Sequence, residues 1–126
     1  MNLARAIIQN WGVYMKMKIA VLGGGNGAHA MAADLSCGGF EVRMCEMPEF
    51  RQNIEQLMKQ NNEIEISGHA SAWRDDTRVI RVSKVTTDVK EAIEDADLIN
   101  VVVPAFGHEP FYKAMAPHLE DGQVVV

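Results

Sequence analysis

The residues of this sequence that most clearly indicate chemistry are a run of small ones from Gly23 to Ala28, GGGNGA. The run fits the pattern G-x-G-x-x-A, with Gly23, Gly25 and Ala28 in the three constrained positions. In such a motif the first glycine permits a tight turn, the second lets a pyrophosphate approach the backbone, and the third residue lets a helix lie close to a strand. We therefore expect a dinucleotide pyrophosphate against the backbone of Gly25, Asn26 and Gly27, at a helix start. The alternative is a strand-to-helix turn that binds nothing.

An acidic residue after the second expected strand indicates which dinucleotide would bind. Glu46 lies 23 residues beyond Gly23. A carboxylate at this position accepts hydrogen bonds from the adenosine ribose hydroxyls and repels a 2′-phosphate, which favours NAD over NADP. Arg43 and Arg51 are close in sequence and keep NADP as an alternative, since an arginine could hold the extra phosphate. A strand-end acid that only faces solvent is the other interpretation of Glu46.

A third feature follows the apolar run Leu98–Val103. Because a strand here would end beside the first strand, the residues after it lie at the topological switch point where a cofactor crosses the sheet. We expect Val103, Pro104 and Ala105 to lie along the nicotinamide half of the cofactor. A strand that simply ends in a proline turn would give the same pattern.

Strand-like and helix-like patterns alternate along most of the chain. Strand patterns cover Met17–Leu22, Phe40–Cys45, Val79–Thr86, Leu98–Val103 and Gln123–Val126. Helix patterns cover Asn26–Cys37, Pro48 to about Gln60, Asp88–Glu94 and Pro110–Met115, and Ile64 and Ile66 alternate as in a strand. This order predicts an α/β fold of the Rossmann type, a doubly wound parallel sheet between two helix layers, with these five strands in the order 3-2-1-4-5. We assign residues 17–126 to one dinucleotide-binding domain and residues 1–16 to an N-terminal extension.

No side chain can be assigned a catalytic role from the sequence. His108 could approach the nicotinamide, although capping of a helix beside Glu109 is the simpler explanation. His29 is either near the cofactor or a solvated helix residue. Cys45 fits a small apolar filler better than a nucleophile. The histidines have no metal-ligand spacing supported by a third ligand, so no metal site is expected.

Composition restricts the class of protein. The 126 residues are 48% hydrophobic and 23% charged, as in a globular domain, and the formal net charge of −5 argues against a nucleic-acid partner. No apolar run approaches the roughly 20 residues that span a bilayer. Two cysteines make no disulfide framework, and this favours a reducing, cytoplasmic setting.

The segments KIAVLGGGNGAHAMAADLS and DADLINVVVPAFGHEP, with the acid after the second strand, resemble the N-terminal NAD-binding domain of the octopine/opine dehydrogenase family. That family is related to glycerol-3-phosphate dehydrogenase and ketopantoate reductase, and the resemblance covers about Met17 to Val126. It implies reversible, NAD(P)-dependent reduction of an imine formed from a 2-oxo acid and an amino acid.

The resemblance also implies a second, helical domain with the substrate site and a catalytic histidine, neither of which can be assigned to these residues. We therefore expect no turnover by this chain alone. The apolar edge at Gln123–Val126 suggests a homo-oligomer, most simply a two-fold dimer. A glycerol-3-phosphate dehydrogenase-like or ketopantoate reductase-like enzyme, or a non-catalytic nucleotide-binding module, are the alternatives.

Overall fold

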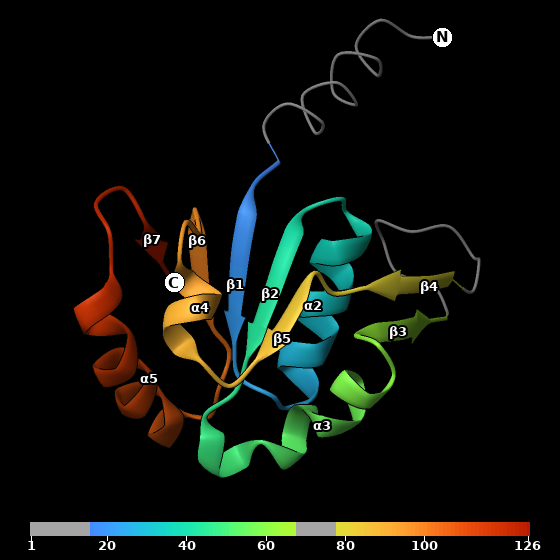
Figure 1. Ribbon diagram of the computed structural model, residues 1–126, viewed down its shortest axis with the longest axis horizontal. Helices are drawn as coiled ribbons and strands as arrows, with labels where there is room; N and C mark the ends of the chain where they lie inside the picture. Colours follow the sequence, from blue (N-terminus) through green and yellow to red (C-terminus); the bar gives the residue numbers. More distant parts are fainter. Residues whose placement is uncertain (1–15, 68–77) are drawn as a thin grey trace, which may run out of the picture.

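Strands and helices alternate along the chain as the sequence predicts (Figure 1). The structure, a computed structural model, describes residues 16–67 and 78–126, so the predicted extension lies outside it except for Lys16. The main sheet is formed by β1 (Lys18–Leu22), β2 (Glu41–Cys45), β5 (Lys84–Thr86), β6 (Leu98–Val101) and β7 (Val124–Val125). Neighbouring strands are all parallel, in the order β5-β2-β1-β6-β7. The predicted order and the doubly wound fold are therefore confirmed.

Helices connect these strands. They are α2 (Asn26–Cys37), α3 (Gln52–Lys59), α4 (Val89–Ile93) and α5 (His108–Met115), with short 3₁₀ turns η1 (Pro48–Phe50), η2 (Ala105–Gly107) and η3 (Ala116–His118). The continuous helix predicted from Pro48 to about Gln60 is wrong, because η1 and α3 are separate elements joined at Arg51. The apolar anchors Ile54 and Leu57 belong only to α3, whereas η1 buries no residue.

The strand predicted over Val79–Thr86 also divides in two. Its first part, β4 (Arg78–Arg81), pairs antiparallel with β3 (Glu63–Ile66) in a separate ribbon, and its second part is β5. The division falls at Val82, which is fully buried and donates its N–H to the carbonyl of Asn62 over 2.9 Å. The alternation of apolar and polar residues is interrupted beside the break, where the polar residues Ser83 and Lys84 follow one another.

Two apolar layers hold the sheet between the helices. Ile19 and Val21 of β1 pack toward α2 and α3, while Ala20 and Leu22 pack toward α4 and α5. This alternation is the one expected for a strand covered on both faces. In register, Leu22 lies opposite both Cys45 and Val101, so β1, β2 and β6 end together at one edge of the sheet.

Within residues 16–67 and 78–126, no helix is long and apolar enough to cross a membrane. The same residues contain no cluster of three or more histidine, cysteine or acidic side chains arranged to hold a metal ion.

Candidate functional site: the carboxyl edge of the sheet

The glycine-rich turn joins β1 to α2 at the carboxyl edge of the sheet. Gly23 has a φ of +135°, and a Cβ at this position would clash with the carbonyl oxygen of Val102. The Gly23 N–H donates to the carbonyl of Cys45 over 2.7 Å. The turn is thus held against the ends of both neighbouring strands, and only glycine fits its first position.

Gly25 precedes α2, and its backbone would accept other residues. Its φ of −80° and ψ of −175° are ordinary extended values, and a Cβ there would find no heavy atom within 4 Å. No side chain of the described residues caps the N-terminus of α2. The first N–H groups of a helix have no partner within the helix and attract anions. The open space at Gly25 therefore fits a phosphate group that approaches α2.

The remaining motif residues set how closely α2 approaches the sheet. Ala28 and Ala32 are 1% and 0% exposed and belong to the core layer that contains Val21. A Cβ on Gly27 would lie 3.5 Å from Cγ1 of Val102, which is an ordinary contact. Asn26 is exposed at the start of the helix. The small residues thus bring the N-terminus of α2 against the end of β1.

Glu46 follows β2 and is buried, with 5% of its surface exposed. Its Oε1 accepts the N–H of Met47 over 2.9 Å, and its Oε2 accepts the side-chain amide of Asn53 over 3.1 Å. A Cβ on Gly24 would lie only 2.6 Å from Oε2. The carboxylate is therefore pressed against the glycine-rich turn and does not extend into solvent.

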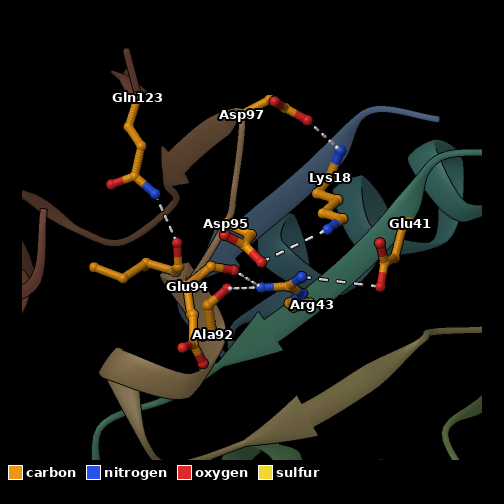
Figure 2. A network of polar contacts seen from close by, with 9 residues as sticks. Lys18, Glu41, Arg43, Ala92, Glu94, Asp95, Asp97 and Gln123 are labelled. Carbon is orange, nitrogen blue, oxygen red and sulfur yellow. Dashed lines mark hydrogen bonds and ion pairs between the residues drawn. The ribbon is translucent and has the colours of Figure 1, made fainter. Parts of the chain in front are cut away.

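The two arginines near Glu46 in sequence lie elsewhere. Figure 2 shows the guanidinium of Arg43 between Glu41 and the end of α4, where it donates to the carbonyls of Ala92 and Glu94. Arg51 is exposed. Neither arginine lines the cavity that contains Glu46.

That cavity, of about 370 Å³, lies where β1, β2 and β6 end. Small-molecule sites have volumes of roughly 300–1,000 Å³. Four residues predicted from the sequence line it, namely Gly25, Glu46, Val103 and Pro104. Its other lining residues are Gly24, Met47, Phe50, Asn53, Val102, Phe106, Gly107, Pro110 and Phe111. The predicted Ala105 is exposed and lies outside this lining.

Several lining residues were missed by sequence reasoning. Phe50 and Phe106, on the 3₁₀ turns after β2 and β6, are 50% and 80% exposed, and exposed aromatic rings beside a cavity are typical of a ligand site. Asn53 looks in the sequence like any polar residue at the start of an amphipathic helix. No pattern in the sequence distinguishes these side chains from solvated ones.

A second hollow, of about 650 Å³, lies beside α2 and β3. It is bordered by Met31 and Ala33 on one side and by Ile64 and Ile66 on the other. Gly27 of the glycine-rich turn also borders it, but the residues that follow β2 and β6 do not.

Among the described residues, His29, His108 and the buried Cys45 do not form a nucleophilic or acid–base centre. Nδ1 of His108 lies 3.4 Å from the Tyr112 hydroxyl, and Nδ1 of His29 lies 3.0 Å from the carbonyl of Gly25. Neither histidine lines the 370 Å³ cavity. Burial, together with the nearby charge of Glu46, raises the pKa of the Cys45 thiol to about 12. Cys45 therefore stays protonated and acts as the apolar filler that the sequence predicts.

The chain matches known proteins along nearly its whole described length. A family described as "NAD-dependent glycerol-3-phosphate dehydrogenase N-terminus" matches residues 18–126. Octopine dehydrogenase of Mizuhopecten yessoensis is 34% identical over 116 residues, which cover 89% of this chain and 28% of that protein. Glycerol-3-phosphate dehydrogenase [NAD(P)+] of Streptococcus equi subsp. zooepidemicus is 35% identical over 112 residues, which cover 88% of this chain and 30% of that protein.

A solved structure agrees with the sequence matches. Octopine dehydrogenase in complex with NADH and agmatine superposes with a TM-score of 0.73 and 31% identity, covering 86% of this chain and 27% of that one. The chain thus spans less than a third of the length of these relatives. The resemblance to the N-terminal domain of the octopine and opine dehydrogenases is confirmed, as is its relation to glycerol-3-phosphate dehydrogenase.

Proposed function

Because the chain belongs to the family of NAD-dependent glycerol-3-phosphate dehydrogenase N-terminal domains, we propose that it is the NAD-binding part of an opine-type dehydrogenase. Similarity to octopine dehydrogenases supports the opine type, since two of them are 34% identical to this chain over 116 residues. The chain covers 28% of each, so the activity of the whole protein is part of the proposal.

The observation that carries the cofactor assignment is the open space at Gly25 in front of the uncapped start of α2. We assign the pyrophosphate to the backbone of Gly25, Asn26 and Gly27, because the first N–H groups of a helix favour phosphate. Glu46 would accept the adenosine ribose hydroxyls, since a carboxylate has lone pairs beyond the two engaged by Met47 and Asn53. Its negative charge favours NAD, with NADP as the alternative.

The nicotinamide half is assigned to the residues after β6. Val103 and Pro104 line the cavity with apolar groups, and Ala105 follows them at the surface. A bound nicotinamide cofactor supplies or accepts a hydride. The role of these three residues is to orient the cofactor and to exclude water from one side of it.

We propose that these 126 residues do not catalyse turnover alone. Imine reduction needs a proton donor beside the reacting carbon. Among the described residues that line the cavity, Glu46 is the only ionisable one, and it is engaged by Met47 and Asn53. His108 follows the lining residue Gly107 but does not itself line the cavity, and its ring lies beside Tyr112. In the intact enzyme, other residues would bind the 2-oxo acid and the amino acid.

A glycerol-3-phosphate dehydrogenase-like activity is the second candidate, supported by the family that matches residues 18–126. A ketopantoate reductase-like enzyme and a non-catalytic nucleotide-binding module are further alternatives. Steady-state NADH oxidation by the intact native protein distinguishes them. We expect NADH to be oxidised in the presence of a 2-oxo acid together with an amino acid, whose imine is reduced. We expect no NADH oxidation with dihydroxyacetone phosphate or ketopantoate. Binding of NADH without turnover of any of these would indicate the non-catalytic module.

The same assay on the 126-residue chain tests the proposal that it is inactive alone. We expect no NADH oxidation above background with any of these substrates. Robust turnover that is abolished in His108→Ala would contradict this, because the proton donor would then lie within these residues.

Self-association is proposed through the edge of the sheet at β7. Within residues 16–67 and 78–126 this strand pairs with β6 alone, and Val124, Val125 and Val126 are 54%, 37% and 68% exposed. An exposed apolar edge strand offers unpaired backbone groups and favours pairing with a second copy. The two free cysteines fit a reducing, cytoplasmic setting.

A further inference from the structure

The carboxylate of Glu46 is held by one donor from α3 and one from the adjacent backbone N–H. Asn53, the second residue of α3, donates its side-chain amide to Oε2 over 3.1 Å, while the N–H of Met47 binds Oε1 over 2.9 Å. The two oxygens thus have different donors, and this fixes the plane of the carboxylate.

The position of Asn53 is set by the core. Its neighbour Ile54 is fully buried, and Leu57 one turn later is 3% exposed, so α3 cannot rotate without exposing both. Asn53 also lines the cavity beside the glycine-rich turn. The amide is therefore presented by a helix anchored on the same core layer as α2.

Gly24 shows how closely these groups approach. It is an unconstrained position of the motif, yet a Cβ there would lie 2.6 Å from Oε2 of Glu46 and 2.8 Å from Cβ of Asn53. Both contacts are shorter than side chains tolerate. The glycine-rich turn, the strand-end acid and α3 therefore meet at a single point, the Oε2 atom.

We propose that Asn53 is a positioning residue that orients Glu46 and thereby sets the discrimination between NAD and NADP. The amide satisfies one lone pair of Oε2 and leaves the outer lone pairs of the carboxylate for ribose hydroxyls. A carboxylate released from Asn53 could take other rotamers, and its charge would lie further from a 2′-phosphate. This role depends on the proposed cofactor site.

The test is the dissociation constant for NADPH divided by that for NADH, with both constants measured by calorimetry. Asn53→Ala should reduce this ratio about threefold, mainly by weakening NADH binding, as expected for the loss of one hydrogen bond. In a Glu46→Ala background the same substitution should leave the ratio unchanged, because no carboxylate remains to be oriented. Gly24→Ala, which displaces Oε2 directly, should reduce the ratio as well.

Gln56→Ala is the matched control, because Gln56 is an exposed amide of α3 that binds Gln60 and not Glu46. Thermal unfolding followed by circular dichroism checks that each variant is folded. An unchanged ratio in a folded Asn53→Ala variant would overturn the proposal. An equal reduction in the Glu46→Ala background would also overturn it, because Asn53 would then contact the cofactor itself. If the wild-type chain bound neither nucleotide, the proposed cofactor site would be wrong, and the role of Asn53 would be wrong with it.

Discussion

The guanidinium of Arg43 donates to the backbone carbonyl of Glu94, at the residue where α4 ends (Figure 2). It also reaches the carbonyl of Ala92 over 3.5 Å, and the side-chain amide of Gln123 binds the carbonyl of Ile93 over 2.7 Å. The last carbonyls of a helix have no partner within it. Arg43 therefore satisfies the end of α4 at the edge of the sheet opposite the glycine-rich turn.

Replacing Arg43 should lower stability and leave cofactor preference unchanged. Arg43→Met keeps the aliphatic stem but leaves the carbonyls of Ala92 and Glu94 without this donor, and we expect a loss of about 1.5–3 kcal/mol in the free energy of unfolding. Urea denaturation measures it. Arg51→Met removes the same charge from an exposed site and should change stability little. If the Arg43→Met variant lost NADPH affinity while its NADH affinity stayed constant, Arg43 would instead face the ribose.

Glu46 should determine the choice of dinucleotide. In Glu46→Gln the negative charge that repels a 2′-phosphate is absent. The dissociation constant for NADPH divided by that for NADH should therefore fall about tenfold, which corresponds to a change of about 1.4 kcal/mol in relative binding free energy. Parallel titrations with the two nucleotides measure the ratio. Glu49→Gln, an exposed acid outside the cavity lining, is the control and should have no effect. Tighter binding of NADPH than of NADH by the wild-type chain would contradict the role given to Glu46.

The two cysteines should differ in reactivity. Because burial raises the pKa of Cys45 to about 12, its thiol stays neutral in mildly alkaline buffer, whereas Cys37 is half-buried near the surface. A disulfide reagent should therefore label one thiol per folded chain and both thiols in denaturant. Rapid labelling of a folded Cys37→Ser variant would be inconsistent with the burial of Cys45.

The pKa of Cys45 also predicts how stability changes in alkali. The unfolded thiol ionises near its ordinary pKa of 9.0, while the folded thiol stays protonated until about 12. The folded chain then binds more protons than the unfolded chain, so the free energy of unfolding should fall as pH rises from about 9 toward 12. Cys45→Ala should lack this part of the pH dependence, and denaturation curves across that range would detect it.

Charging the edge strand should reduce self-association. Val124→Lys places a cation on β7, where an exposed valine favours pairing with another copy. Light scattering across a concentration series should show a smaller average mass than for the wild-type chain. Val79→Lys changes a similarly exposed valine on β4 and should have no such effect. A wild-type chain that stays monomeric at high concentration would remove the proposed pairing.

The sequence predicts those parts of the fold whose signals are local. Gly23 must be glycine because of its positive φ and its contact with Val102, and the sequence motif encodes that directly. The five parallel strands follow from short apolar or alternating runs that are separated by helix patterns. The division at Val82 has only a weak local signal, the consecutive polar residues Ser83 and Lys84. That β4 pairs with β3 rather than with the main sheet depends on a contact between separate segments of the chain.

The candidate site is predictable to a similar extent. Glu46 stands out because of its spacing from the glycine motif, whereas Asn53 does not, because its hydrogen bond to Glu46 depends on how α3 packs. Arg43 is near Glu46 in sequence, yet alternate residues of a strand point to opposite faces, and its guanidinium lies at the end of α4. Proximity in sequence was therefore a poor guide to which charges face the cavity.

A dinucleotide that lies against the backbone at Gly25 would be displaced by a side chain there, so Gly25→Val should abolish its binding. A Cβ at this position meets no protein atom within 4 Å, so the variant should fold, as thermal unfolding would check. The valine would fill the space required by the pyrophosphate, whereas Ala30→Val, at an exposed position further along α2, is the matched control. Calorimetric titration with NADH should show binding to the wild-type chain and to the Ala30→Val variant, and none to the Gly25→Val variant. Unchanged NADH affinity in a folded Gly25→Val variant would contradict the account.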